Sequence, residues 1–417
     1  MYIPRDIEDL VVELSGEYAA VLVTGPRQVG KSTMLEHLIT EAKGVPAGSR
    51  SSRRETVTLD DLTERALATS DPSLFLQLHE PPILIDEVQY APELLLELKK
   101  RIDAGAPAGS FWLTGSQPFR LMKLAGESLA GRVAILPVSS MSQHEAFGTG
   151  AASPLPFDLT ALKARQTEYH PANMIELYDR MYRGAMPAIV SGDKSNVRVY
   201  YSSYLQTYIE RDVRDLAGDV QVLSFLNFIT AVAARCAQEV NVSALCRDTG
   251  ETAATVKAWL AILERSGIIF YLHPYSNNQL TRTVKTPKLY FHDCGLVAHL
   301  TRWEGPKTMA VGAMSGAFME NYVVSELRKG YLARGEEPLL YYYRDRDARE
   351  IDMVLESDGE LHPIEIKRSA SPSLGMTRNF SALDRGSVPR GAGAIVCMAE
   401  KLGALDGRTF VIPAWMV

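Results

Sequence analysis

Short apolar runs alternate with helical patterns over the first third of the chain. The runs are rich in β-branched and aromatic residues, and the stretches between them have the period of helices. They are Ala20–Thr24, Thr56–Leu59, Ile83–Ile85, Phe111–Thr114 and Val133–Val138. Such alternation predicts a parallel sheet covered by helices.

The pattern changes after a loose stretch rich in Gly, Ser and Pro at residues 148–157. Residues 174–272 read mostly as helices, and strand-like runs return from Lys288 onward around a few helices. We therefore expect an α/β protein with four parts: 1–150 with the parallel sheet, a helical connector at 151–225, a third part at 226–288 and a C-terminal part at 289–417.

The third part has a compact pattern of its own. Apolar positions indicate a short helix from Val242 and a second helix over Thr252–Arg265, with a Thr249-Gly250 turn between them. The run Gly267–Tyr271 then continues as a strand. Helix, turn, helix and strand in this order are the outline of a winged helix.

Composition limits the class of protein. The 417 residues are 46% hydrophobic and 23% charged, which excludes a disordered chain, a collagen and a disulfide scaffold. The net charge of −6 gives no overall basic field for nucleic acid. Residues 1–145 hold 14 basic and 20 acidic residues, whereas residues 226–288 hold 7 basic and 4 acidic ones. Local contact with nucleic acid is therefore not excluded.

Cysteine spacing and the apolar segments bear on where the protein is located. Four cysteines form no C-x-x-C pair, so we expect free thiols. Residues 1–6 lack the apolar core of a signal peptide. The most apolar stretch, Leu223–Cys236, is interrupted by polar residues and is too short to span a bilayer. We expect a cytoplasmic protein with no membrane contact.

A phosphate-binding loop follows the first predicted strand. Residues 25–33 read GPRQVGKST, which is G-x-x-x-x-G-K-[ST] between a strand and a helix. Two glycines let the loop curl so that backbone N–H groups face a phosphate. Lys31 would reach the β- and γ-phosphates of ATP, and the Ser32 hydroxyl would ligate Mg²⁺. The residues expected to hold the nucleotide are Gly25, Pro26, Arg27, Gln28, Val29, Gly30, Lys31, Ser32 and Thr33.

Polar residues at the ends of later strands complete this site. Asp86 and Glu87 end the third strand, so Asp86 would support Mg²⁺ through water and Glu87 would polarise the attacking water. After the fourth strand we favour Ser116 as the residue that orients this water, with Thr114 as its rival. Arg132 either neutralises transition-state charge, in its own subunit or in a neighbour's, or is an exposed arginine before a strand.

These motifs resemble a known family. Residues 18–145 are similar to the P-loop ATPases of the AAA superclass, in a prokaryotic branch with GPRQVGKST, an ILIDE-type strand, LTGS and SLAGR in this order. The resemblance covers about a third of the chain. It implies five parallel strands with the glycine loop on the first.

Near the C-terminus, two strands flank an Asp358-Gly359 turn. With these as the two turn residues, Asp352 lies opposite Glu365 and Glu350 lies opposite Lys367, all on one face. The other face is apolar and carries Ile351, Met353, Leu355, Ile364 and Ile366. Pro363 removes one donor from this ladder.

Two opposed carboxylates repel each other unless a positive group lies between them. A divalent cation with oxygen ligands is one candidate, which predicts a second metal site. Lys367 would then stabilise a phosphate anion or position water. The alternative is an exposed strand face on which glutamates and lysines compensate each other.

A second resemblance concerns this region. Asp352 with Glu365-Ile366-Lys367 resembles the D…E-x-K arrangement of restriction-endonuclease-like folds, and Glu320 on a preceding helix matches as a further acid. Residues 175–417 are similar to a domain of unknown function usually fused to this ATPase branch, through YIERDV, TVKAWLAILERSGIIF and KTPKLYFHDCGL. The resemblance implies a winged helix followed by a nuclease-like domain (the PD-(D/E)XK type), without establishing cleavage. We interpret His292 as structural.

The sequence does not decide what the predicted winged helix contacts. Its basic residues could supply three or four phosphate contacts, and a protein-contact or purely structural role is an equal alternative. These residues are Lys257, Arg265, Arg282, Lys285 and Lys288.

We expect an enzyme that binds and hydrolyses ATP with Mg²⁺ and couples nucleotide state to a nuclease-like domain in contact with nucleic acid. The first alternative is an ATP-dependent metal nuclease acting on DNA. The second is an ATP-switched interaction module with a non-catalytic C-terminal domain. A homo-oligomer or a protein partner is compatible with each.

Overall fold

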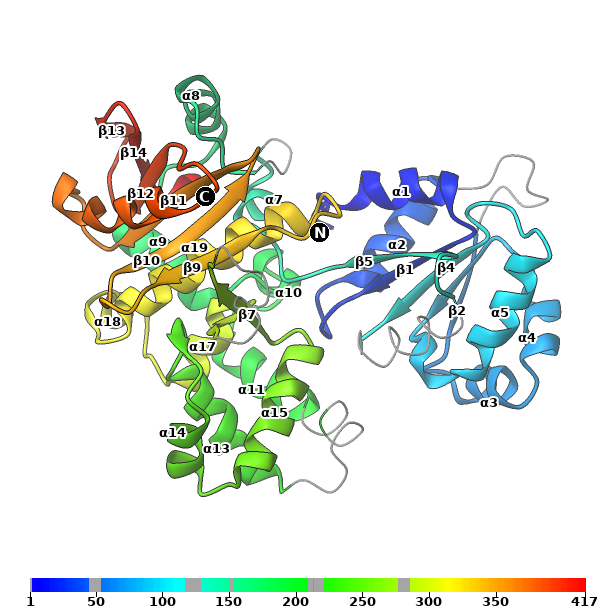
Figure 1. Ribbon diagram of the computed structural model, residues 1–417. Coiled ribbons are helices and arrows are strands. Elements are labelled where there is room, and N and C mark those ends of the chain that lie inside the picture. The colour runs from blue at the N-terminus through cyan, green and yellow to red at the C-terminus, as the bar shows by residue number, and fades with distance from the viewer. Residues whose placement is uncertain are drawn as a thin grey trace.

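The computed structural model describes residues 2–44, 54–116, 129–149, 154–208, 213, 221–276 and 286–417. Two sheets organise this part of the chain (Figure 1). A five-stranded sheet lies on the right of Figure 1, and a nine-stranded sheet occupies the left. The fold is therefore α/β, as predicted.

The N-terminal sheet is entirely parallel. Its strands are β1 (Ala20–Thr24), β2 (Glu55–Thr58), β3 (Ile83–Asp86), β4 (Phe111–Gly115) and β5 (Val133–Pro137), in the order β2-β3-β4-β1-β5. They match the five predicted runs to within about one residue, so the predicted parallel sheet is confirmed. Since all five strands run the same way, their carboxyl ends meet at one edge.

Helices cover both faces of this sheet (Figure 1). Because successive side chains of a strand point to opposite faces, Val21 and Val23 pack against one layer and Ala20 and Leu22 against the other. The first layer is α1 (Glu8–Glu17) and α2 (Lys31–Thr40); the second is α3 (Leu62–Ser70), α4 (Pro72–Leu78) and α5 (Glu93–Asp103), with the 3₁₀ helix η1 (Val88–Tyr90) between β3 and α5.

A helical connector follows the first sheet. After α7 (Gln143–Phe147), which still belongs to the first part, it contains α8 (Leu159–Glu168), α9 (Met174–Arg183), α10 (Pro187–Val190) and α11 (Val197–Tyr208). Among the described residues of 151–225, every regular element is a helix, as the sequence predicts.

The third part has the element order of a winged helix. It consists of α13 (Val222–Ala233), β6 (Gln238–Glu239), α14 (Val242–Thr249), α15 (Ala253–Arg265), β7 (Ile269–Pro274) and β8 (Lys288–Phe291). β8 pairs antiparallel with both β7 and β6. The boundary expected between residues 288 and 289 falls inside β8, so this unit and the C-terminal part share a strand.

The C-terminal sheet continues from these strands, because β7 also pairs in parallel with β9. Its remaining strands are β9 (Leu340–Arg344), β10 (Glu350–Ser357), β11 (Glu360–Lys367), β12 (Gly393–Cys397), β13 (Gly403–Asp406) and β14 (Thr409–Pro413). The whole order is β13-β14-β12-β11-β10-β9-β7-β8-β6, with parallel and antiparallel pairs. The helices of this part are α17 (Cys294–Leu300), α18 (Pro306–Val311), α19 (Ser315–Leu332), η3 (Leu374–Arg385) and η4 (Ala414–Met416).

The hairpin of β10 and β11 follows the predicted register from Ser357, opposite Glu360, back to Met353, opposite Ile364. Pro363 is accommodated opposite Val354. The paired ladder ends at Met353, so Asp352 does not stand opposite Glu365 within it.

A bulge in β10 also makes one prediction about its faces wrong. Pairing with β9 shifts by one residue between Ile351 and Val354. The extra residue reverses the alternation of side chains. Ile351 consequently packs with Val354 and Phe380 on one face, while Met353 and Leu355 belong to the main core on the other.

One core cluster joins the three regions of the chain. It includes Val21 and Leu38 of the first sheet layer, Met186 and Ile189 of the connector, and Met353 of the C-terminal sheet. The four cysteines are free, with Cys246 half-buried and the other three buried. No helix among the described residues is long and apolar enough to cross a membrane.

Candidate nucleotide site and C-terminal carboxylate cluster

The glycine loop connects the end of β1 to the first residue of α2. Gly25 has φ +150 and Gly30 has φ +86, values that L side chains rarely adopt. A Cβ atom at Gly25 would lie 1.9 Å from the Val138 carbonyl oxygen. Glycine is therefore required at Gly25 by close packing and at Gly30 by backbone conformation.

Two polar side chains at the start of α2 point into the site. Lys31 is buried, and its Nζ donates to the carbonyl oxygens of Gly25 at 3.0 Å and Pro26 at 2.8 Å. The Ser32 hydroxyl donates to the Asp86 carboxylate at 2.5 Å. The loop thus brings an ammonium and a hydroxyl to the carboxyl edge of the sheet.

The ends of β3 and β4 supply the other predicted residues. The Thr114 hydroxyl donates to Asp86 at 2.5 Å, and the Ser116 hydroxyl donates to Glu87 at 3.0 Å. Both rivals for the position after β4 therefore contact an acid of β3. The buried amide of Gln89 also donates to Glu87 and, at 3.1 Å, to Ser116. Sequence reasoning missed Gln89.

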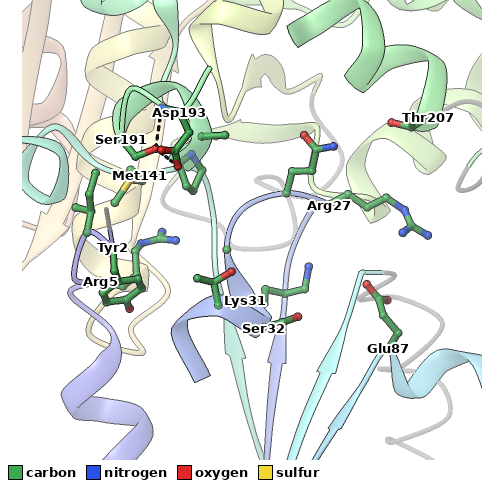
Figure 2. Close-up of a pocket in the computed structure, with 16 residues that line it drawn as sticks. Tyr2, Arg5, Arg27, Lys31, Ser32, Glu87, Met141, Ser191, Asp193 and Thr207 are labelled. Carbon is green, nitrogen blue, oxygen red and sulfur yellow. Dashed lines mark hydrogen bonds between the residues drawn. The ribbon is translucent and has the colours of Figure 1, made fainter. Parts of the chain in front are cut away.

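A pocket of about 930 Å³ opens above the loop (Figure 2). In Figure 2, Lys31 and Ser32 lie near the middle of the view and Glu87 at the lower right, with Ser191 and Asp193 at the upper left. Its lining comes from the loop, from the N-terminal segment and from the connector: Tyr2, Ile3, Arg5, Arg27, Gln28, Gly30, Lys31, Ser32, Thr33, Glu87, Met141, Pro187, Ala188, Ser191, Asp193 and Thr207. The loop motif gives no sign of the residues beyond the first domain, because they reach the pocket only through folding.

The rest of the loop contacts other elements. Arg27 donates to the Tyr90 hydroxyl at 3.2 Å, and Val29 is fully buried. Pro26 lies against Gly267, between α15 and β7: a Cβ atom at Gly267 would be 2.8 Å from the Pro26 Cγ. The loop therefore touches the winged-helix unit directly.

Arg132 does not belong to the nucleotide site of its own chain. It precedes Val133, which is level with Ala20 at the start of β1, whereas the glycine loop follows the end of β1. Its guanidinium binds Asp103 at 2.5 Å and is partly exposed. The prediction of a role within the same subunit is therefore wrong, since Arg132 lies at the opposite edge of the sheet.

A second set of charged side chains gathers beside β10 and β11. Lys367 Nζ lies 2.8 Å from the Asp352 carboxylate and 2.5 Å from that of Glu365. The backbone N–H of Ile366 also donates to Asp352 at 2.8 Å. These three residues of the predicted D…E-x-K set are thus in direct contact.

The predicted acid on α19 is bound to a different lysine. Lys288 of β8 lies 3.0 Å from the Glu320 carboxylate and 2.7 Å from that of Glu350, and the Tyr290 hydroxyl donates to Glu320 at 2.7 Å. Sequence reasoning missed both Lys288 as a partner of Glu320 and Tyr290.

Two carboxylates of this cluster, those of Glu365 and Glu320, have raised pKa values. Burial, with a contribution from the charge of Asp352, raises the pKa of Glu365 to about 8. Burial and Asp352 also raise the pKa of Glu320, against the opposing effect of Lys288. Among the described residues, no group of three or more acidic, His or Cys side chains is arranged to hold a metal ion. In this arrangement lysine ammonium groups lie between the carboxylates, and a second metal at the cluster stays a prediction.

The outward face of α15 carries little positive charge. Among the outward residues of α15 are Ala254, Lys257, Ala258, Glu264 and Arg265. Lys288 is buried and ion-paired and is not available for phosphate contact, which corrects its earlier assignment. Arg282 and Lys285 lie outside the described residues.

Comparisons with known proteins divide the chain in three. Residues 17–147 match the model of an AAA domain, and residues 174–307 and 315–417 match two domains of unknown function, DUF8612 and DUF4143. The expected single domain of unknown function over 175–417 is therefore two domains.

Two mycobacterial relatives and one solved structure align with most of the chain. Uncharacterized proteins of Mycobacterium tuberculosis and Mycobacterium bovis are each 27% identical over 94% of this chain and 80% of their own length. A Walker-type ATPase of Pyrococcus abyssi aligns with 71% of this chain and 94% of its own, at 16% identity and a TM-score of 0.44. The chain thus carries an AAA-type P-loop NTPase domain at residues 17–147, followed by two domains whose function is unknown.

Proposed function

We propose that the chain binds ATP with Mg²⁺ and hydrolyses it, using the loop and the acids of β3. The observation that carries this proposal is the hydrogen-bonded group of Ser32, Asp86 and Thr114 beside Lys31. A serine hydroxyl and a carboxylate are oxygen donors of the kind that Mg²⁺ accepts, so this group fits the ion. Bound there, Mg²⁺ would neutralise charge on the β- and γ-phosphates.

The chain's own groups would divide the remaining work. Lys31 now donates to two loop carbonyls, and phosphate oxygens can replace these acceptors without leaving its ammonium unsatisfied. The Glu87 carboxylate is oriented by Ser116 and Gln89, so it can receive a proton from attacking water in a fixed direction. The wall formed by the connector would exclude bulk water from the bound nucleotide.

The same pocket supports coupling to the C-terminal region. Its lining includes Pro187 and Asp193 of the connector, so nucleotide binding changes what these residues contact. We infer that ATP acts as a switch on the two following domains, which engage a nucleic acid or a protein partner. The sparse charge on α15 supports a protein partner for that helix, and any nucleic-acid contact would lie elsewhere.

The direct test is nucleotide binding and turnover by the purified full chain and by Lys31→Ala. We expect wild type to bind and hydrolyse ATP only with Mg²⁺ present, and the variant to lose both. Lys100→Ala is a matched control, because that lysine is exposed and forms an ion pair with Glu97 of the same helix. Turnover by Lys31→Ala at the wild-type rate would reject the assignment.

A second candidate function is metal-dependent cleavage of DNA. The direct contacts among Asp352, Glu365 and Lys367 favour it, because phosphodiester cleavage uses carboxylates and a lysine of this kind. Lys367 and Lys288 lie between pairs of the cluster's carboxylates, and this arrangement opposes it. Degradation of single- and double-stranded DNA with Mg²⁺ or Mn²⁺, lost in Asp352→Asn, would support cleavage; degradation that is absent from wild type or that survives in Asp352→Asn would reject it.

A further inference from the structure

Arg5 is a buried cation beside the glycine loop that the nucleotide motifs do not include. It lies just before α1 and is 8% exposed. Its Nη1 donates to the Val29 carbonyl at 2.7 Å, its Nη2 to the Ser139 carbonyl at 2.9 Å, and its Nε to the Glu145 carboxylate at 2.9 Å. One guanidinium thus joins the loop to the segment that leaves the first sheet.

The contact with Val29 falls at a sensitive point of the loop. Gln28 and Gly30, on either side of Val29, both have left-handed backbones, with φ +63 and φ +86. The direction of the Val29 carbonyl therefore fixes how the following N–H groups of the loop face the pocket. A planar guanidinium can hold this carbonyl and two other acceptors in one geometry, which an ammonium cannot.

Glu145, which accepts a hydrogen bond from Arg5, is also fixed by its surroundings. Glu145 accepts hydrogen bonds from the backbone N–H groups of Asp6 at 3.0 Å and Ser142 at 2.8 Å, and it belongs to the capping box of α7. The carboxylate that binds Arg5 is therefore itself held in place by backbone hydrogen bonds. Any change in the loop at Val29 is resisted by, or passed to, residues 139–145.

Residues 139–145 are in turn fixed to α19. Lys329 Nζ donates to the Met141 carbonyl at 2.9 Å, and the backbone N–H of Gln143 donates to Glu326 at 2.8 Å. Lys329 and Glu326 form a buried ion pair at 2.8 Å. The same helix carries Glu320 of the carboxylate cluster, about 14 Å from Lys329 along the axis at ~1.5 Å per residue.

We propose that Arg5 is a positioning residue for the nucleotide loop and that it transmits the state of the loop to α19 through residues 139–145. This inference rests on the proposed ATPase function. Arg5 sets the loop in its binding conformation, while Lys329 and Glu326 hold the far end of the same connection. Nucleotide binding and the position of α19 are thereby linked through contiguous hydrogen bonds.

The first test compares Arg5→Met, Arg5→Lys and the control Arg334→Met, whose side chain is exposed and pairs with Glu336. We expect Arg5→Met to raise the Kd and KM for ATP at least tenfold with a smaller effect on kcat, and Arg5→Lys to give a milder rise. The control should match wild type. Circular dichroism of the same samples verifies folding, and Arg5→Lys decides the matter if Arg5→Met is unfolded.

A folded Arg5 variant with wild-type Kd and KM would overturn the proposal. If wild type itself neither binds nor hydrolyses ATP, the proposed function fails instead, so the two failures are distinguishable.

The second test is a double-mutant cycle with Lys329→Met, a residue that does not line the pocket. We expect Lys329→Met to raise the Kd for ATP several-fold. In the double variant Arg5→Met/Lys329→Met, we expect the Kd to rise by a factor smaller than the product of the two single factors. Purely multiplicative effects, or no effect of Lys329→Met, would overturn the connection to α19. Lys329→Arg, which keeps the charge, should restore most of the affinity.

Discussion

At the end of β3, two neighbouring acids have different surroundings. Asp86 accepts hydrogen bonds from the hydroxyls of Ser32 and Thr114, whereas Glu87 accepts from Ser116 and Gln89. The backbone of Glu87 is left-handed, with φ +57, which turns its side chain away from the direction of the strand. In the proposed mechanism, this turn would let Asp86 serve the metal and Glu87 serve the attacking water.

The separation of roles predicts the behaviour of Glu87→Gln. The amide keeps the size and the hydrogen bonds of the side chain but cannot accept a proton. We expect ATP binding to remain within about threefold of wild type, while single-turnover hydrolysis falls by roughly 10²–10⁴-fold. Glu93→Gln, an exposed change at the start of α5, should leave both unchanged. Hydrolysis at the wild-type rate in Glu87→Gln would remove this residue from the reaction.

Glu365 makes a different prediction, about stability. Burial, together with the Asp352 charge, raises its pKa to about 8 in the folded chain, from an ordinary value of 4.5. The folded state therefore prefers the protonated acid. Its stabilising contribution is full below the ordinary pKa of about 4.5 and is lost as pH rises through about 8.

We expect the free energy of unfolding of wild type to fall from pH 5 to pH 8 relative to that of Glu365→Gln. Urea denaturation at several pH values measures this difference. Glu360→Gln, an exposed residue at the start of the same strand, is the control and should follow wild type. Parallel profiles for wild type and Glu365→Gln would show that the pKa of Glu365 is not raised.

At the scale of elements, local sequence patterns predict the strands and the hairpin register. They do not predict the contacts between segments that are distant in the sequence. The strands of the first sheet and the register of the β10–β11 hairpin follow from apolar runs and from the Asp358-Gly359 turn, which are local features. The bulge at Ile351 depends on how β10 pairs with β9, and no local pattern records this. Lys288 and Arg5 are likewise isolated charges in the sequence, and only the fold gives them partners.

The contact between the loop and the winged-helix unit is another long-range feature. Gly267 follows the end of α15, has φ +71 and leaves room for Pro26 of the loop. Gly250 follows α14 with φ +76, but a Cβ atom there would meet nothing within 4 Å. The two glycines therefore share a backbone requirement and differ in their neighbours.

This pair of glycines predicts how loop and winged helix interact. Alanine at either position costs roughly 1–2 kcal/mol because of the left-handed backbone. We expect Gly267→Ala to raise the KM for ATP a further three- to tenfold by displacing Pro26, and Gly250→Ala to leave it unchanged. Thermal unfolding and steady-state kinetics of both variants test this. Equal KM values in the two variants would show that the Pro26 contact does not reach the nucleotide.

At the scale of the whole molecule, one large core cluster spans the chain and the charge is uneven. The main core cluster runs from the first sheet through the connector to the C-terminal sheet, so these parts pack against one another and are not separate domains on a flexible chain. Residues 1–145 hold the acid excess, and the exposed face of α15 is nearly neutral. The continuous core is compatible with the proposed coupling between the nucleotide site and the C-terminal domains, and the charge argues against a chain that coats nucleic acid along its length.

Arg132 carries a prediction about assembly. It lies at the edge of the first sheet opposite the glycine loop, partly exposed, so its guanidinium can act on a nucleotide only if that nucleotide belongs to another copy of the chain. In a head-to-tail assembly, such an arginine neutralises charge on the neighbour's γ-phosphate. We expect Arg132→Ala to bind ATP normally and to lose hydrolysis by on the order of 10²-fold or more.

Mixing two inactive variants tests the action between copies. Arg132→Ala keeps an intact loop, and Lys31→Ala keeps an intact arginine, so a mixed assembly contains some complete sites. An equal mixture should recover about a quarter of the wild-type rate if the copies pair at random, and the rate per chain should rise with protein concentration. If Arg132→Ala alone hydrolyses ATP like wild type, the arginine serves only its surface contact with Asp103, and assembly is not needed to complete the site.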